Sequence, residues 1–408
     1  MSPLRFTTAG ESHGPALVAI LEGVPAGLPL ATADVDAQLA RRQQGYGRGR
    51  RMQIEKDAIE LLSGVRAGET LGSPIAMLVQ NRDWPKWEEI MSATLLEGEA
   101  PGDLRKRAVT RPRPGHVDLA GMLKYDRLDA RDLLERASAR ETTARVAAAA
   151  VCRRLLAEFG VRIGSHVVHL GGVDASPPDA LPDDLNAAVD GSPLRTLDAA
   201  AEKEMIGRID AAKKAGDTLG GICEVVVTGL PVGLGSHVSW DRKLDGRLAG
   251  ALMSIHAVKG VEIGLGFEGS RRPGSQVHDE MEGAPGRLLT GHVRRRSNRA
   301  GGLEAGITTG EPLLLRVAMK PIATLMSPLA TIDLATGGSA EAVAERSDVT
   351  AVPAMGVIAE AMTAFVLADA FLEKFGGDSL GETRRNYEGY LRRVGERFTP
   401  SSGSRDGE

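Results

Sequence analysis

The first residues with chemical potential stand in a short glycine-framed segment, Gly10-Glu11-Ser12-His13-Gly14. Its G-x-S-x-G pattern matches the nucleophile elbow of serine hydrolases, in which a strand turns sharply into a helix. Too few residues precede it here to build the earlier strands of such a sheet, and the run that follows, PALVAILEGVPAG, is typical of a strand and a turn. The alternative interpretation is a glycine-framed loop that carries His13.

A second cluster concentrates cationic side chains on a flexible backbone. Five arginines and three glycines share the eleven residues from Arg41 to Arg51. A helix precedes the cluster, so it does not match the dinucleotide-binding fingerprint, which follows a strand. Most charge runs are solvated surface loops. The glycines favour a different interpretation, a loop that folds over a ligand and pairs its guanidinium groups with carboxylate or phosphate.

Three further segments carry groups that suit anion chemistry. In residues 111–116 (RPRPGH), two prolines stiffen a turn that holds arginine beside His116, an arrangement suited to protonating a phosphate. Ser138 and Glu141 fit a capping box, which predicts a helix just after Ser138 and an anion site at its N-terminus. Residues 346–348 (RSD) repeat this pattern before another long helix, and residues 320–324 (KPIAT) add a cation and a hydroxyl after a strand.

Together these segments predict one site in which many arginines, two histidines and an aspartate surround a small polyanion. No P-loop and no metal-ligand spacing occurs in the sequence, so no metal site is expected. His166, His169 and His237 lie outside these segments and should matter far less.

The elements that must position these residues form a mixed α and β pattern. Glycine stop signals and apolar periodicity predict five helices: about 33–42, from after Ser138 to Gly160, 199–215, 241–258, and 352–375. Short runs rich in valine, isoleucine and leucine predict strands at LRFTT, ALVAILEG, IEKDAIELLSG, SPIAMLVQ, CEVVVTGLPVG and LLLRVAMKPIAT. Because strands and helices do not alternate strictly, a doubly wound sheet is not indicated.

Composition limits the functional class. Apolar residues make up 42% and charged residues 25% of 408 residues, the balance of a globular protein. Aromatics are only 3% and the net charge is −4, so a nucleic-acid binder that stacks bases is not expected. Cys152 and Cys223 do not make a disulfide framework, the N-terminus lacks a secretory pattern, and no uncharged run reaches the length of a membrane span. We expect a cytoplasmic protein with no membrane contact.

The segments resemble, in order, the motifs of the chorismate synthase family. These are GESHG at 10–14, RPGH at 113–116, R-x-S-A-R-E-T at 136–142, AVKGVEIG at 257–264, NRAGG at 298–302, KPIAT at 320–324 and RSD at 346–348. The resemblance covers roughly residues 4 to 385. Any one motif is weak evidence, but seven in order with compatible spacing are highly specific.

The resemblance implies a 1,4-trans elimination that converts 5-enolpyruvylshikimate 3-phosphate to chorismate and phosphate, the last step of the shikimate pathway. It further implies a need for reduced FMN without net redox change. An external flavin reductase is expected, with NADPH as a possible electron source. The implied fold is a β-α-β sandwich, here one domain over residues 1–395 followed by a disordered tail at 396–408, assembled as a homotetramer.

Residue by residue, the resemblance assigns three roles. His13 would protonate the reduced flavin, His116 would assist the leaving phosphate, and Asp348 would relay a proton at the flavin. The residues that would hold the substrate are Arg42, Arg48, Arg51 and Arg140. The residues that would contact FMN are Arg136, Ala137, Ser138, His256, Ala257, Ala305, Lys320, Pro321, Ile322, Ala323, Thr324 and Arg346.

Two positions depart from the family's pattern. Position 256 is His in place of Asn or Gln, which retains hydrogen bonding and adds a titratable group. Position 305 is Ala in place of Gly, which strains the backbone if φ is positive there. Two rival functions stay open at this point, namely a serine hydrolase that uses Ser12 and an anion or nucleic-acid binder without turnover.

Overall fold

A four-stranded antiparallel sheet forms one side of the molecule. Its strand order is β1-β2-β6-β3, with β1 at Arg5–Ala9, β2 at Ala16–Glu22, β6 at Ile75–Gln80 and β3 at Ile59–Leu61. Alternate residues of β2 are buried, as the period of two requires. The structure, a computed structural model, describes residues 4–49, 56–94, 108–344 and 347–397.

A five-stranded antiparallel sheet forms the other side. Its order is β10-β15-β9-β7-β8, with β10 at Val258–Ile263, β15 at Leu313–Met319, β9 at Gly221–Thr228, β7 at Arg162–Leu170 and β8 at Val173–Asp174. Both sheets are antiparallel, in agreement with the prediction against a doubly wound parallel sheet.

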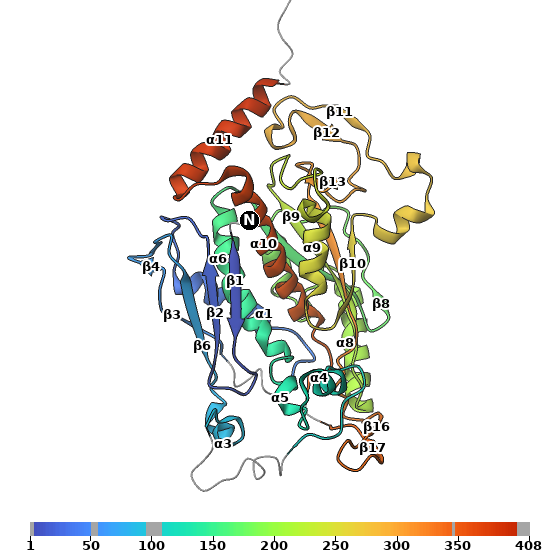
Figure 1. The fold of residues 1–408 in the computed structure, drawn as a ribbon. Helices are drawn as coiled ribbons and strands as arrows, with labels where there is room; N and C mark the ends of the chain where they lie inside the picture. Colours follow the sequence, from blue (N-terminus) through green and yellow to red (C-terminus); the bar gives the residue numbers. More distant parts are fainter. Residues whose placement is uncertain (1–3, 50–55, 95–107, 345–346, 398–408) are drawn as a thin grey trace, which may run out of the picture.

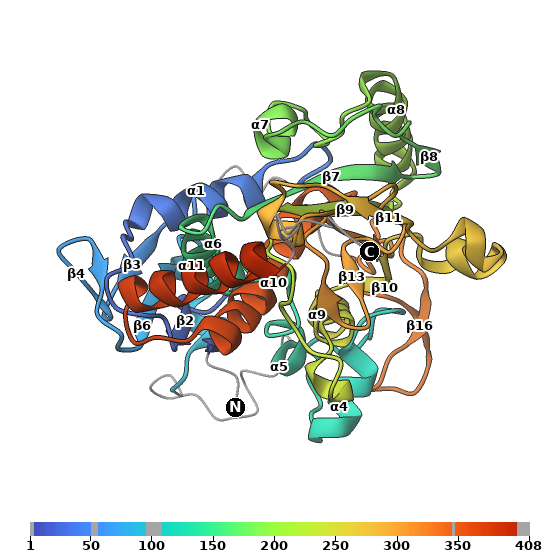
Figure 2. The same cartoon turned by 90° about the horizontal axis from the view of Figure 1, so that it is seen from above.

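Helices lie between the two sheets (Figures 1 and 2). Helix α6 (Thr142–Ala157) packs on β2, while α10 (Val352–Phe375) packs on β7 and β9. Helices α1 (Thr32–Gln43) and α9 (Leu244–Met253) extend this layer. One hydrophobic core takes side chains from Leu4 to Tyr387, so the chain folds as a single mixed α and β unit.

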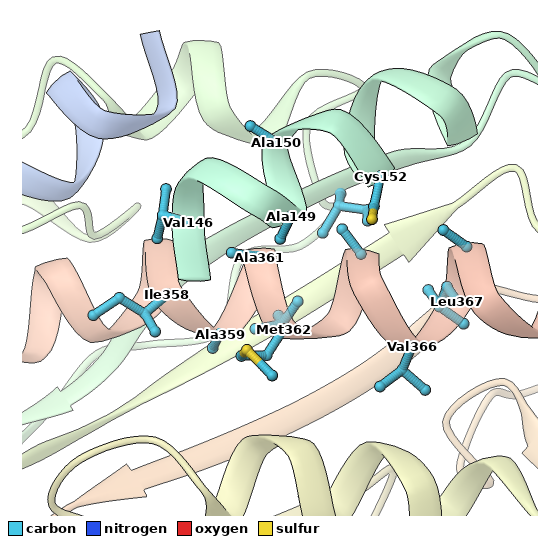
Figure 3. Close-up of a cluster of buried hydrophobic side chains, with 14 of the residues drawn as sticks. Val146, Ala149, Ala150, Cys152, Ile358, Ala359, Ala361, Met362, Val366 and Leu367 are labelled. Atoms are coloured by element: carbon cyan, nitrogen blue, oxygen red, sulfur yellow. The ribbon is translucent and has the colours of Figure 1, made fainter. Parts of the chain in front are cut away.

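Small side chains bring α6 and α10 together. Ala149 of α6 faces Ala361 of α10, and valine and methionine side chains fill the space beside them (Figure 3). Helix α10 has the length and hydropathy of a membrane span, but 94% of its apolar window is buried inside the protein. It is therefore the central core helix of this fold.

The predicted elements are mostly confirmed. Helix α8 (Ala199–Ala215) ends at Gly216 with φ of 74°, as the glycine stop signal predicts, and α1, α6 and α10 also lie where expected. The helix predicted over 241–258 is wrong at both ends. A 3-10 turn (Trp240–Arg242) precedes α9, and Ala257, at φ of 63°, ends the helical path before β10.

The remaining elements lie around this frame. They include α3 (Glu88–Met91), α4 (Asp118–Tyr125), α5 (Arg131–Leu134), α7 (Leu185–Val189) and α11 (Leu380–Arg397). Within the described part of the chain there are also four two-stranded ribbons: β4–β5 (Val65–Arg66 and Glu69–Thr70), β11–β12 (Met281–Gly283 and Val293–Arg295), β13–β14 (Leu303–Glu304 and Ile307–Thr308) and β16–β17 (Ala330–Ile332 and Ser339–Glu341). The predicted site residues Arg51 and Arg346, and residues 398–408 of the predicted tail, lie outside the described residues.

Candidate active site

The segment Gly10–Gly14 connects two antiparallel strands, β1 and β2. A nucleophile elbow needs a strand followed by a helix, so the serine hydrolase interpretation is wrong. Gly10 has φ of 106°, and a Cβ there would stand 2.4 Å from the carbonyl oxygen of Ala16. Ser12 ties the loop to the region before α6, since its N–H donates to the Glu135 carbonyl oxygen at 3.0 Å and its Oγ lies 3.2 Å from Ser138 Oγ.

His13 is held by a buried carboxylate. Its Nδ1 lies 2.8 Å from Glu135 Oε2, and its backbone N–H donates to the same oxygen at 3.0 Å. Arg131 donates to Glu135 Oε1 at 3.0 Å, and the ring of Trp87 stacks on the imidazole with centroids 3.8 Å apart. Burial raises the pKa of Glu135, but its bonds to His13 and the charge of Arg131 outweigh burial and lower it.

His116 has a similar carboxylate partner. Its Nδ1 lies 2.5 Å from Oδ1 of Asp118. Asp118 is the first residue of α4, and its side chain is fully buried. Arg113 binds the same carboxylate through Nε at 2.8 Å and reaches Thr324 Oγ1 at 3.0 Å. Burial opposes ionisation of Asp118, but hydrogen bonds from His116 and Arg113 hold its pKa well below its usual range. The RPGH segment is thus joined to the KPIAT segment.

Lys320 extends this connection to the strand of the AVKG motif. Its Nζ donates to the carbonyl oxygen of Gly115 at 3.0 Å, and its backbone N–H donates to that of Ala257 at 2.9 Å. Burial lowers the pKa of Lys320, and the nearby charge of Lys259 lowers it further. Ser347 Oγ then donates to the Thr324 carbonyl oxygen at 2.8 Å, which brings the RSD segment to the same place.

The predicted helix start after Ser138 is confirmed, but the capping box is not formed as predicted. A 3-10 turn (Ala139–Glu141) leads into α6, and Ser138 Oγ accepts from the N–H of Arg140 at 3.3 Å. The carboxylate of Glu141 instead accepts from Thr8 Oγ1 at 2.7 Å and Arg145 Nε at 2.8 Å. A tertiary contact with β1 has replaced the local bond that the sequence pattern favoured.

Two of the predicted anion-binding arginines share a buried acid. Arg140 Nη1 donates to both carboxylate oxygens of Asp57, at 2.7 and 2.8 Å, and Arg42 Nη1 lies 3.9 Å from the same group. Arg42 also donates to Thr142 Oγ1 at 3.0 Å. Two guanidinium groups therefore converge on one carboxylate beside the start of α6. Arg136, by contrast, is exposed and donates to the carbonyl oxygen of Thr8 at 2.9 Å.

Asp348 receives the described part of the Gly/Arg segment. Its Oδ1 accepts from the N–H of Gly49 at 2.6 Å, and its Oδ2 lies 3.3 Å from Arg48 Nε. The carbonyl oxygen of Gly47 accepts from Val349, and Tyr46 donates to Asp210 Oδ1 at 2.8 Å. This part of the segment is therefore docked on the protein in this structure.

His256 presents an unusual buried atom. Its Nδ1 is inaccessible and has no hydrogen-bond partner among the described residues. Burial lowers the pKa of His256, while the charge of Glu141 acts in the opposite direction and that of Arg145 lowers it further. Its neighbours therefore place it beside the start of α6, with the other cationic groups.

The structure brings most, but not all, of the predicted site residues together. Ala305 occupies the turn between β13 and β14, where Leu244 at the start of α9 donates to the carbonyl oxygen of Gly306. The described contacts connect Ala305 to none of the other predicted residues. Ala305 has φ of 50° and Gly306 has φ of 84°, the signs of a type I′ turn, so the strain anticipated for alanine here is present.

Sequence reasoning missed the acids that support the predicted site. The sequence analysis did not propose Glu135, Asp118 or Asp57, because an acidic side chain is not expected to bind an anion. Trp87 was missed as well. Position was the only available signal, since Asp118 lies two residues after His116 and Glu135 immediately before the R-x-S-A-R-E-T motif.

Comparison with known proteins agrees with the family that the sequence motifs indicate. The chorismate synthase family profile matches residues 4–372. The chain is 57% identical over 395 residues to a chorismate synthase from Symbiobacterium thermophilum, covering 97% of this chain and 100% of that protein. It is 58% identical over 398 residues to one from Saccharopolyspora erythraea, covering 97% and 98%. A solved structure described as a crystal structure of chorismate synthase superposes with a TM-score of 0.75 at 43% identity, covering 96% of this chain and 98% of that one.

Proposed function

Because this chain belongs to the chorismate synthase family, we propose that the residues gathered above form the active site for the reaction of that family. The chain is a carbon–oxygen lyase that releases phosphate from 5-enolpyruvylshikimate 3-phosphate by 1,4-elimination to give chorismate, at the end of the shikimate pathway. The observation that carries the site assignment is a set of contacts around two carboxylate-bound histidines. They join the RPGH, KPIAT and RSD segments to one another and the GESHG segment to Ser138. The Gly/Arg segment touches both groups, through Arg42 to Thr142 and through Arg48 to Asp348.

The cationic groups would bind the substrate, which carries two carboxylates and a phosphate. Arg42 and Arg140 both point at Asp57 beside the start of α6, and a substrate carboxylate or phosphate would pair with the same two guanidinium groups. Arg48 is within 3.3 Å of Asp348, and a substrate carboxylate or phosphate would compete for its guanidinium. Arg51 is proposed for the same role from the resemblance alone.

His116 would transfer a proton to the leaving phosphate through Nε2. Its Nδ1 is engaged by Asp118, so Nε2 is the ring atom that remains to serve this purpose. Lys320 lies next to the same turn through its bond to Gly115, and its positive charge would stabilise the phosphate that departs. His13 would hold a second proton at its own Nε2, and Asp348 would accept or return a proton near Arg48.

The site fits reduced FMN in one observable respect, the buried Nδ1 of His256, which the polar edge of a ligand would satisfy. When bound, the reduced flavin would supply electron density to the substrate as its C–O bond breaks. Besides His256, the proposed contacts are Arg136, Ala137, Ser138, Ala257, Lys320, Pro321, Ile322, Ala323 and Thr324. Ala305 and Arg346 join this proposal on the resemblance alone.

The decisive experiment measures phosphate release from 5-enolpyruvylshikimate 3-phosphate under anaerobic conditions. We expect turnover with reduced FMN and none without flavin or with oxidised FMN alone. A matched reaction with the His13→Ala, His116→Ala double variant controls for phosphate released by contaminants. Equal turnover without flavin would refute the cofactor assignment while leaving the lyase activity intact.

The proposal also covers the domain, the cellular location, the assembly and the source of electrons. We propose that residues 1–395 form one catalytic domain whose two sheets and intervening helices are the β-α-β sandwich of the family. The chain would work in the cytoplasm as a homotetramer, with electrons reaching FMN from an external reductase that uses NADPH. Light scattering at micromolar concentration tests the assembly, and a stable monomer would contradict it. Failure of NADPH to support turnover unless a separate flavin reductase is added would support the external source.

A further inference from the structure

The carboxylate of Glu135 binds both the backbone and the side chain of His13. The carboxylate is 2% exposed, lies just after α5, and receives the backbone N–H and the ring Nδ1 of His13 on a single oxygen. Its other oxygen lies 3.0 Å from both His13 Nδ1 and Arg131 Nη1. Backbone and side chain of one histidine are thus clamped by one carboxylate that a cation holds from behind.

We propose that Glu135 is a positioning residue that fixes His13 in the tautomer protonated at Nδ1, so that every proton exchanged by His13 passes through Nε2. This inference rests on the proposed function, in which His13 holds a proton during the reaction. It adds a residue, Glu135, that neither the sequence motifs nor the family resemblance assigned.

The chemistry of a carboxylate determines the tautomer. An ionised carboxylate can only accept hydrogen bonds, so an imidazole nitrogen 2.8 Å away must donate to it. The lowered pKa of Glu135 keeps it ionised near neutral pH. At His116 the same argument fails, because Nδ1 faces both the Asp118 carboxylate and the Arg113 guanidinium, at 2.5 and 3.1 Å.

The orientation of the ring is fixed as well. Trp87 stacks on the imidazole with an interplanar angle of 25°, and its own Nε1 donates to Asp83 at 3.3 Å. A flip of the imidazole by half a turn would place a carbon atom against Glu135 Oε2 and lose the hydrogen bond. Arg131, whose guanidinium also lies over the Trp87 ring at 5.2 Å, prevents the carboxylate from rotating with it.

Arg131 makes Glu135→Gln an informative substitution. Glutamine offers one oxygen and one NH₂ group, and a charged donor gains more from the oxygen than a neutral one. We therefore expect the amide oxygen to face Arg131 and the NH₂ group to face His13, an orientation that also gives up the bond from the backbone N–H of His13. The NH₂ group can only donate to Nδ1, which drives the proton to Nε2 and gives the wrong tautomer. Removing Arg131 as well, in Glu135→Gln/Arg131→Met, lets the oxygen turn back to His13.

The chain contains a matched control on the five-stranded sheet. His166 Nε2 lies 3.4 Å from Glu224, and Glu224 is bound in turn by Arg316 at 3.2 Å, so histidine, glutamate and arginine recur in the same order. These residues lie on β7, β9 and β15 and belong to no predicted motif. Glu224→Gln therefore repeats the change of charge and shape without touching the proposed site.

The test reads the tautomer directly. Full-length protein with ¹⁵N-labelled histidine is studied by solid-state NMR at pH 8.5 without flavin, and the His13 signals are assigned by their loss in His13→Ala. We expect protonated Nδ1 in the unaltered protein and in Glu224→Gln, protonated Nε2 in Glu135→Gln, and a return to protonated Nδ1 in the double variant. Protonated Nε2 in the unaltered protein overturns the inference without need of any variant.

Turnover separates this inference from the proposed function. In Glu135→Gln, kcat should fall by roughly 10²-fold or more with KM changed little, as for an imidazole held in the wrong tautomer. The double variant should recover part of that loss, which a merely structural role of Glu135 would not produce. If His13→Ala is inactive and Glu135→Gln retains full kcat, the positioning role is wrong. If His13→Ala retains full kcat, the role of His13 in the proposed function fails, whatever the tautomer.

Discussion

Glu360 of α10 is the buried acid on which three arginines converge. Its carboxylate accepts from Arg41 at 2.9 and 3.0 Å, Arg153 at 2.7 Å and Arg195 at 3.1 Å. These arginines come from α1, from α6 and from the segment between α7 and α8, so the cluster joins three parts of the core to the central helix. Because Arg41 precedes Arg42, the cluster also fixes the end of α1 that enters the proposed active site. We predict that Glu360→Gln destabilises the whole protein.

The magnitude follows from the ionisation of Glu360. Burial raises its pKa, but the charges of Arg41 and Arg153 outweigh this and hold the pKa at about 2, against an ordinary value of 4.5. That gap corresponds to about 3 kcal/mol. Breaking a buried ion pair costs about 3–5 kcal/mol, because the opposite charges are left uncompensated. For a chain of this size we expect the Tm to fall by about 4–6 °C.

The pH dependence has a definite sign. A depressed pKa contributes stability above the ordinary value and loses it as the pH falls toward the folded value. The advantage of the unaltered protein over Glu360→Gln should be constant above about pH 6, smaller by about 1 kcal/mol at pH 4, and nearly absent near pH 2.

The assay is chemical and thermal unfolding of both proteins from pH 4 to 8. Glu373→Gln is the matched control, since it lies on the same helix and pairs with Arg242 and Arg247 at the surface. It should change stability by less than about 1 kcal/mol. A Glu360→Gln protein that unfolds within 1 °C of the unaltered one, or a difference that grows on acidification, would refute the reasoning.

Three other predictions concern the site and its surroundings. Replacing His13 or His116 with Ala should lower turnover about 10²–10⁴-fold while far-UV circular dichroism is unchanged, and His169→Ala, at a partly exposed position paired with Asp174, should not. Ala305→Gly should stabilise the protein by about 0.5–1 kcal/mol in urea unfolding, because φ of 50° suits glycine, and a loss of stability would contradict the type I′ assignment. Arg48→Ala should weaken substrate binding by about 1.5–3 kcal/mol in calorimetry. Unaltered affinity would show that Arg48 does not contact the substrate.

The position of the Gly/Arg segment changes one earlier expectation. The sequence favours a flexible loop that folds over a ligand, and in the structure Tyr46, Gly47 and Gly49 already bond to the protein. Gly47 approaches the side chains of Ile209 and Thr350 so closely that a Cβ would lie 3.0 Å from Ile209. Glycine here serves close packing as well as flexibility, and only the folded structure distinguishes the two uses.

The sequence by itself determined many of the helices and strands, the family and most of the candidate residues. Helix α8 begins and ends where the pattern predicts because its signals, Asp198 at the N-cap and Gly216 at the end, act within one turn of backbone. The motifs of the proposed site are legible for the same reason, since each is a run of neighbouring residues. Strand β7 was not predicted, because its apolar residues do not alternate along the strand. Helix α11 was missed although Leu380, Tyr387 and Leu391 recur at helical spacing.

The tertiary structure decided which groups act on one another. His13 and Glu135 are separated by 122 positions, and Arg140 and Asp57 by 83, so no local pattern relates their charges. Glu141 shows the same principle. Its carboxylate accepts a hydrogen bond from Thr8 of β1, so it does not form the local capping bond that the sequence pattern favours. Short-range signals determine where helices and strands begin, but the ionisation and tautomer of a buried side chain depend on groups that only packing brings within 3 Å of it.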